Sequence, residues 1–229
     1  MALFGNNEEK VKLLDSEIAR EMGFDKTFPI TGQIYPRKTD SQISDVLSGI
    51  AQSAHKFAND IRLLQNLREI EEPFGKKQIG SSAMPYKRNP MRCERITSLA
   101  RYIICNGMNS DFTSGSQWLE RTLDDSANRR LVIPETFLAT DAVLNIVLGV
   151  VKGLVVYPKV IGRHVDKELP FMASENILME TVKAGGDRQK IHEKIRKYSM
   201  EAATLMKETG TDNDLLDRIR KDDDFAKIR

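Results

Sequence analysis

The feature that most constrains the fold is a regular apolar seam between residues 40 and 70. Apolar residues recur there at alternating spacings of four and three, which is typical of a helix that packs along its whole length. They are Ile43, Leu47, Ile50, Ala54, Phe57, Ile61 and Leu64. Such a helix has about 30 residues and is roughly 45 Å long, and Asp40 or Ser41 can serve as its N-cap. This length predicts an elongated helical bundle.

Two further long helices are predicted after this seam. One begins with Asn89 as its N-cap and Pro90 in the first helical position. The other runs from about Ser126 to Leu154, is expected to kink at Pro134, and is apolar on nearly every side over residues 143–151. A helix that is apolar all round needs cover on all sides. The chain has few helices left to cover it, so we expect the cover to come from other subunits.

A domain boundary is predicted where the apolar register breaks, near Tyr157. Residues 1–156 are expected to form a central helical-bundle domain that contains a long loop at about residues 72–89. Residues 157–229 are expected to form a small C-terminal helical domain, with Asp187 as the N-cap of its longest helix. Its predicted helices are 158–168, 174–183, 187–207 and 213–221. The predicted fold class is all-α, because alternating strand patterns are confined to short stretches.

Composition and charge exclude several function classes. The chain has 35 basic and 33 acidic residues, so its net charge of +2 argues against a nucleic-acid partner. The apolar run at residues 143–156 is shorter than the roughly 20 residues of a membrane helix, so no membrane partner is expected. Cys93 and Cys105 would lie about 18 Å apart on one helix, too far for a disulfide. A reducing cytoplasm is the simplest location, and no His or Cys cluster predicts a metal.

The long loop is locally basic. From Pro73 to Arg92 it has no acidic residue and five cations, which are Lys76, Lys77, Lys87, Arg88 and Arg92. A loop that concentrates positive charge beside small hydroxyl residues is suited to meeting an anion. Long loops in compact domains are usually either functional or disordered.

The same loop contains the run GSSAMPYKRNP at residues 80–90. This run resembles the signature loop of the fumarase/aspartase superfamily, in the version found in the adenylosuccinate lyase family. Two other blocks resemble that family, WLERTLDDSANRR at residues 118–130 and ELPFMASEN at residues 168–176. The resemblance covers essentially the whole chain.

The resemblance implies a carbon–nitrogen lyase of AMP biosynthesis. It would release fumarate by β-elimination from succinyl-AMP and from succinylaminoimidazole-carboxamide ribotide, without a cofactor. The reaction needs a base, a cation near the substrate carboxylate and an acid for the leaving nitrogen. The resemblance also implies a homotetramer with active sites shared between subunits. In that family an N-terminal helical domain with the histidine acid precedes this region, so the chain alone is expected to lack the acid.

The resemblance assigns roles within the signature loop. Ser81 would be the base, and its alkoxide would be stabilised by Lys87 and by the helix start at Pro90. Lys87 and Asn89 would bind the fumarate carboxylates, Met84 would pack over the substrate, and Ser82 would also bind substrate. Taken without the motif, the same residues are ordinary loop serines, a solvated lysine and a helix cap.

A second candidate group lies in the block at residues 118–130. Arg121, Ser126 and Arg130 resemble the family's nucleotide-phosphate ligands, and Ser126 and Arg130 share one helix face because they are four residues apart. Arg95 is a further substrate-site candidate. The alternative is that Arg129 and Arg130 only pair with Asp124 and Asp125.

Other functions remain open on the sequence. None of His55, His164 and His192 is expected to be the acid, since His55 flanks the seam and the other two lie on charged helices. A sister lyase such as argininosuccinate lyase or fumarase is one alternative, but Tyr86-Lys87-Arg88 and the arginine-rich block argue against it. A non-catalytic subunit that acts only in oligomer assembly is the other.

Overall fold

The computed structural model describes residues 1–75, 78–80 and 82–228. Over these residues the regular secondary structure is helical apart from one short ribbon of two antiparallel strands, which confirms the predicted all-α class. The elements in chain order are η1 (Ala2–Phe4), α1 (Glu8–Glu21), α2 (Lys38–Asn66), β1 (Ile70–Glu71), α3 (Met91–Gly115), α4 (Asp124–Lys152), β2 (Val155–Val156), α5 (Pro158–Met172), α6 (Ser174–Lys183), α7 (Arg188–Thr209), α8 (Leu215–Lys221) and η2 (Asp223–Ile228).

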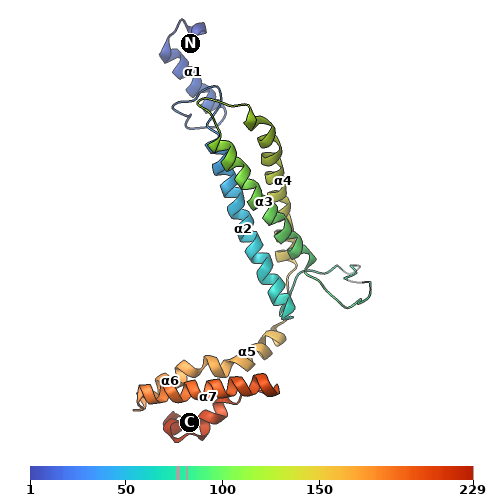
Figure 1. Ribbon diagram of the computed structural model, residues 1–229, viewed down its shortest axis with the longest axis vertical. Helices are drawn as coiled ribbons and strands as arrows, with labels where there is room; N and C mark the ends of the chain where they lie inside the picture. The colour runs from blue at the N-terminus through green and yellow to red at the C-terminus, as the bar shows by residue number, and fades with distance from the viewer. Residues whose placement is uncertain (76–77, 81, 229) are drawn as a thin grey trace. The chain divides into compact units, whose positions relative to one another are not determined.

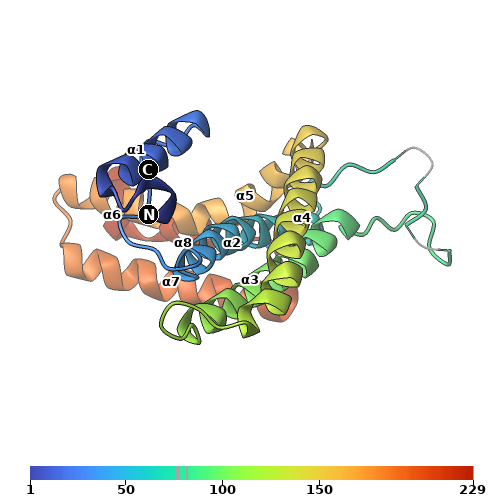
Figure 2. The same cartoon turned by 90° about the horizontal axis from the view of Figure 1, so that it is seen from above.

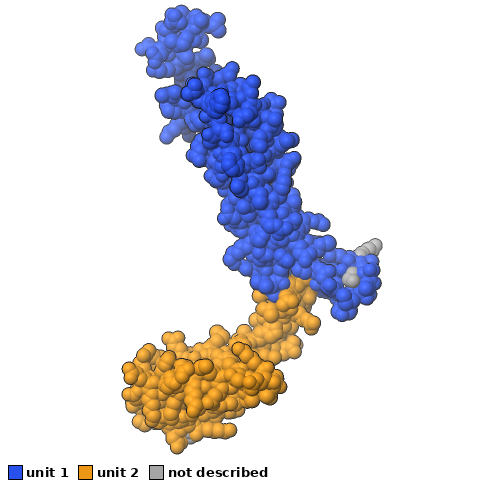
Figure 3. All heavy atoms as spheres, viewed as in Figure 1, with its two compact units in different colours: residues 1–63, 72–154 blue, residues 64–71, 155–229 orange. Residues whose placement is uncertain are grey.

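The chain divides into two compact units (Figure 3). The first contains residues 1–63 and 72–154, and the second contains residues 64–71 and 155–229. Strand β1 belongs to the second unit, where Ile70 pairs with Val156 and Glu71 pairs with Val155. The domain division predicted at residue 156 stays a prediction.

Helices α2, α3 and α4 form the bundle of the first unit (Figure 1). The buried stripe of α2 contains Leu47, Ala54 and Ile61 from the predicted seam. Its most buried members are Ala51 and Ala58, both 0% exposed, whereas Ile43 of the predicted seam is exposed. The distance between packed helices depends on the side chains at the contact. The small alanines therefore take the centre of the stripe and the larger residues flank it.

Helix α4 packs on α3 through one face and leaves apolar residues exposed on another. Val143 and Val150 are fully buried, but the exposed residues include Leu131, Phe137, Leu138, Leu144, Leu148 and Val151. The whole helix is long and apolar enough to cross a membrane by length and composition, a property that core helices of soluble proteins share. The apolar run at residues 143–156, on which the sequence-based argument against a membrane helix rested, is shorter than this helix of 29 residues.

The helix starts differ from two predicted caps. Helix α2 begins at Lys38, so Asp40 and Ser41 lie in its first turn and are not its N-cap. Their side chains bond across the bundle instead, and Ser41 donates to Asp111 of α3 at 2.6 Å. At α3, the Asn89 side chain donates to the carbonyl of Gly80 at 3.3 Å, so Asn89 is not a helix cap either.

The second unit has its own core between α6, α7, α8 and η2. The core residues are Leu178, Ile191, Ile195, Ala202, Leu215, Ile219 and Phe225. The predicted cap of α7 is confirmed, because the Asp187 carboxylate accepts a hydrogen bond from the backbone N–H of Lys190 at 2.8 Å. In the same unit, burial alone would raise the pKa of Asp222, but hydrogen bonds from Lys194 and Tyr198 lower it to about 2.

Candidate active site

The signature loop, residues 72–89, projects from the end of the bundle at which α3 begins (Figures 1 and 2). Its two limbs contact each other within the first unit. The Arg88 guanidinium lies over the Phe74 ring at 5.3 Å from the centroid. A Cβ on Gly80 would lie 1.8 Å from the carbonyl oxygen of Lys87. Only glycine fits this close approach of the two limbs, which explains the first residue of the GSS run.

The loop brings four of the predicted substrate residues into one segment. Ser82, Met84 and Lys87 are exposed, and Asn89 is partly buried by its bond to Gly80. Arg95 is exposed on the second turn of α3. The predicted base, Ser81, lies outside the described residues. The loop therefore presents Lys87 and Met84 to solvent, where a substrate can reach them.

The start of α3 is capped by a carboxylate from the opposite end of the loop. The two oxygens of Glu72 accept hydrogen bonds from the backbone N–H groups of Arg92 and Cys93, each at 2.9 Å. The first helical N–H, that of Met91, donates to the carbonyl of Asn89 at 2.8 Å. These N–H groups of the first turn are already bonded within the chain. They do not provide the free helix start that was expected to stabilise an alkoxide.

Burial and the neighbouring Glu72 carboxylate raise the pKa of the Cys93 thiol to about 12. A thiol with such a pKa stays protonated at neutral pH, and the thiolate is the nucleophilic form. Cys93 is therefore a packing residue at the base of the loop. Among the described residues no cluster of His, Cys, Asp or Glu could hold a metal ion.

The second candidate group lies at the other end of α3 (Figure 1). Helix α3 has 25 residues and therefore extends about 37 Å. Arg121 lies in the connection that follows α3, and Ser126 and Arg130 lie in the first turns of α4. Arg121, Ser126 and Arg130 thus lie at the same end of the bundle, and this end is separated from the signature loop of the same chain.

Around Arg121 the structure adds a residue that the sequence analysis did not propose. The Nη1 of Arg121 donates to the side-chain oxygen of Gln33 at 3.2 Å. Within the described residues the buried Nε of Arg121 has no hydrogen-bond partner. Ser126 is partly buried and Arg130 is exposed. Gln33 lies 88 residues before Arg121, so no local pattern could have paired them.

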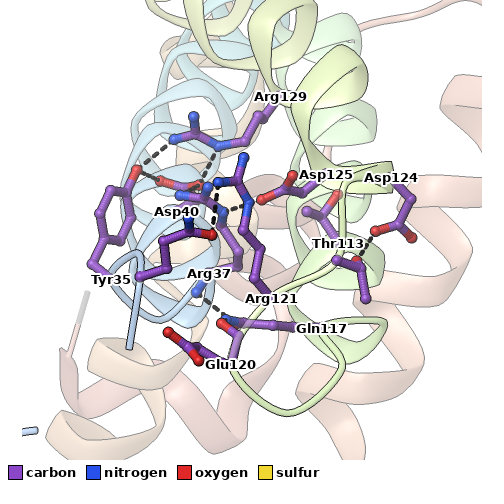
Figure 4. A network of polar contacts seen from close by, with 12 residues as sticks. Tyr35, Arg37, Asp40, Thr113, Gln117, Glu120, Arg121, Asp124, Asp125 and Arg129 are labelled. Carbon is purple, nitrogen blue, oxygen red and sulfur yellow. Dashed lines mark hydrogen bonds and ion pairs between the residues drawn. The ribbon is translucent and has the colours of Figure 1, made fainter. Parts of the chain in front are cut away.

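A buried ion-pair network holds the start of α4 to the start of α2 (Figure 4). The Nε of Arg37 bonds to Asp125 at 2.5 Å, and these side chains are only 6% and 4% exposed. The Nε of Arg129 bonds to Asp40 at 2.9 Å, and Tyr35 donates to the other Asp40 oxygen at 2.7 Å. Burial and the hydrogen bond to Asp40 raise the pKa of the Tyr35 hydroxyl.

This network shows how the neighbouring arginines and aspartates of α4 are paired. Arg129 pairs with Asp40, whereas Asp124 accepts a hydrogen bond from Thr122 and Arg130 stays exposed. The alternative, in which Arg129 and Arg130 only pair with Asp124 and Asp125, is therefore wrong. The residues one position further along α4 than Asp125 and Arg129 are Ser126 and Arg130. They are turned about 100° away from the network, towards a different face of the helix.

Two of the three histidines, His55 and His164, have hydrogen-bond partners within the chain. The Nδ1 of His55 lies 3.1 Å from the Asn59 amide, as expected for a polar partner on the flank of the seam. In the second unit, the Nδ1 of His164 lies 2.6 Å from Glu69. His192 lines a surface cavity of the second unit with Arg188 and Arg196. Whether any of them acts as an acid stays a prediction.

Two known protein families match this chain, one in its first half and one at its C-terminal end. Residues 6–105 match the family described as Lyase, and residues 170–229 match the family described as Adenylosuccinate lyase C-terminus. The chain is 53% identical to the adenylosuccinate lyase of Saccharomyces cerevisiae over 228 residues and 54% identical to that of Schizosaccharomyces pombe. Each match covers 100% of this chain and 47% of the relative. The chain thus spans about half the length of the curated relatives it matches.

Solved structures share the fold at lower identity. A fumarate lyase from Mesorhizobium sp. BNC1 superposes with a TM-score of 0.74 at 21% identity, over 93% of this chain and 45% of that one. A 3-carboxy-cis,cis-muconate lactonizing enzyme from Pseudomonas putida superposes with a TM-score of 0.77 at 19% identity, over 96% of this chain and 47% of that one. At these identities the likeness concerns the fold.

Proposed function

This chain belongs to the adenylosuccinate lyase family, and we propose that it supplies part of an enzyme that releases fumarate from succinyl-AMP. The proposed second substrate is succinylaminoimidazole-carboxamide ribotide, and both steps belong to purine nucleotide biosynthesis in the cytoplasm. The observation that carries the proposal is the identity of 53% over the whole chain, which includes the basic signature loop.

The proposed reaction is a β-elimination. A base removes the proton from the carbon next to a succinyl carboxylate, and that electron pair forms the new C=C bond of fumarate. The C–N bond breaks and the leaving nitrogen takes a proton from an acid. Ser81 is proposed as the base and Lys87 as the cation that stabilises the developing negative charge. Lys87 and Asn89 would bind the carboxylates of the succinyl group, and Ser82, Met84 and Arg95 would complete its pocket.

The nucleotide phosphate would bind at the other end of the bundle. Arg121, Ser126 and Arg130 offer two guanidinium groups and a hydroxyl near a helix start, a combination suited to a phosphate. Gln33 would join them, because its exposed amide lies against Arg121. The acid is proposed to be a histidine other than His55, His164 and His192.

We propose that each active site is shared between copies in a homotetramer. A succinyl nucleotide is much shorter than the roughly 37 Å of α3 that separates the two candidate groups of one chain. The signature loop of one copy must therefore meet the start of α4 of another. The exposed apolar face of α4, which includes Phe137, Leu138 and Leu148, would be covered in such an assembly.

A complementation assay tests the proposal and its alternative. The chain is mixed with a longer relative whose own signature-loop serine is replaced by alanine, and fumarate release is followed by absorbance. We expect release from the mixture but none above background from either partner alone. The matched control is the same mixture made with the Ser81→Ala variant of this chain, which should stay inactive. Assembly without activity would instead support a subunit that acts only in oligomerisation.

A further inference from the structure

The side chain of Glu72 joins the two ends of the signature loop. Glu72 follows strand β1 directly, and its carboxylate bonds to the backbone N–H groups of Arg92 and Cys93 in the first turn of α3. The loop leaves the scaffold beside Glu72 and returns to it at α3, so these two bonds tie its beginning to its end.

The environment makes this tie a strong one. Glu72 is 3% exposed, and each carboxylate oxygen accepts one N–H at 2.9 Å. Hydrogen bonds from N–H groups to an ionised carboxylate are stronger than neutral ones. A negative charge at the first turn also interacts favourably with the helix dipole.

We propose that Glu72 is a positioning residue, whose carboxylate clamps the two ends of the signature loop and so fixes the frame from which Lys87 and Asn89 meet the substrate. The contacts between Phe74 and Arg88 and between Gly80 and Asn89 lie beyond this clamp. They hold the two limbs to each other, whereas Glu72 holds the limbs to the bundle.

The clamp has an electrostatic consequence for the loop. Because Glu72 takes the N–H groups of Arg92 and Cys93 and adds a negative charge, the start of α3 offers little positive potential to an anion. Anion binding at this end of the bundle therefore falls to the loop's own cations, and Lys87 and Arg88 are both exposed within the described part of the signature run. The role of the clamp in turnover rests on the proposed function, while the clamp itself does not.

Hydrogen exchange measured by mass spectrometry on the full chain tests the clamp without any need for activity. In the Glu72→Gln variant an NH2 group replaces one carboxylate oxygen, and this group cannot accept a hydrogen bond from a backbone N–H. We expect exchange in peptides that cover residues 91–95 to speed up by about 2- to 30-fold, the range for loss of a helix cap. Exchange in α7 of the second unit should be unchanged, which shows that the variant is folded. Glu72→Asp keeps the charge but is shorter, so it should exchange at an intermediate rate.

The matched control is Glu71→Gln, which removes the same charge one residue away. Glu71 accepts a hydrogen bond from Tyr157 at 2.9 Å in the second unit and does not cap α3, so exchange at residues 91–95 should stay at the wild-type rate. Unchanged exchange in Glu72→Gln, or an equal effect of Glu71→Gln, would overturn the clamp.

Turnover in the complementation mixture separates positioning from a purely structural role. Glu72→Gln should lower kcat by up to about 100-fold, as expected for a misplaced reacting group. The affinity for AMP, measured by calorimetry, should stay unchanged because the phosphate group binds at the other end of the bundle. Faster exchange with unchanged kcat would overturn the positioning role. If the wild-type mixture shows no turnover, the proposed function fails and the exchange comparison alone decides the clamp.

Discussion

The two ends of the α2–α3–α4 bundle both contain charged residues, but these residues differ in their exposure and in their partners. At the signature loop, charged side chains such as Lys87 are exposed, and the loop is held by contacts to backbone groups at Gly80, Arg92 and Cys93. At the start of α4, arginines and aspartates are buried and bond to one another. The charges at the first end are exposed and are proposed to serve chemistry, whereas most of those at the second end are paired within the bundle, although Arg121 and Arg130 are proposed to bind phosphate there.

The largest expected effect is at the loop end and concerns catalysis alone. In an active assembly that contains this chain, Ser81→Ala should lower turnover by about 10²- to 10⁴-fold, the usual range for loss of a general base. The affinity for AMP should survive, since the phosphate ligands lie elsewhere. Steady-state kinetics and calorimetry measure the two quantities. Full turnover in the variant would remove Ser81 from the mechanism.

At the other end the largest effect should be on folding. Arg37→Leu leaves Asp125 buried without its partner, and breaking a buried pair in this way costs about 3–5 kcal/mol. Denaturant unfolding measures the loss. The double variant Arg37→Met/Asp125→Leu should recover much of it, because an apolar pair of similar volume replaces buried charges at little cost. An Arg37→Leu variant as stable as the wild type would show that the network does not hold the bundle.

Arg130 sharpens the comparison because it lies beside the network without belonging to it. Arg130→Ala should weaken AMP binding by about 10- to 100-fold, as expected for loss of a hydrogen bond to a charged group. The free energy of unfolding should change little, since the side chain is exposed. Calorimetry and denaturant unfolding of the same sample separate the two effects. A large loss of stability with unchanged AMP affinity would place Arg130 in the architecture instead.

The smallest effect is expected for the Tyr35 hydroxyl. Tyr35→Phe removes the hydrogen bond that the hydroxyl donates to Asp40 and the one that it accepts from Arg129, but it leaves the ion pair between Asp40 and Arg129 in place. We expect a loss of about 0.5–1.5 kcal/mol in the free energy of unfolding, with AMP binding unchanged. A loss as large as that of Arg37→Leu would mean that the hydroxyl, and not the ion pairs, is the centre of the network.

What the sequence predicted well depends on local pattern. The periodic seam predicted α2, and Asp187 predicted the start of α7, because a cap and its N–H lie three residues apart. The most buried line of α2 differs from the predicted seam because it runs through Ala51 and Ala58. These alanines are small, so they let the helices approach closely, but they are too weakly apolar to stand out in a sequence pattern. Pattern finds a helix face but not the closest line of contact along it.

The remaining features join residues that are distant in the chain. Glu72 caps α3 from 20 and 21 residues away. The sequence next to the helix start indicated Asn89 as the cap instead. Arg129 bonds to Asp40 across 89 residues, whereas sequence neighbours suggested Asp124 and Asp125. The signature run could be recognised from the sequence because it is a contiguous series of residues. The frame that holds the loop could only be seen in the folded chain.

The length of α3 has a genetic consequence under the proposed function. Because one rigid helix separates the loop from the phosphate-binding group, each chain contributes its loop to one active site and its arginines to another. A harmful substitution at either end therefore damages a centre completed by a neighbour. Conversely, two inactive alleles with lesions at opposite ends, such as Ser81→Ala and Arg130→Ala, would form some intact centres when expressed together. Partial activity in such a heterozygote would reflect the distance that α3 spans.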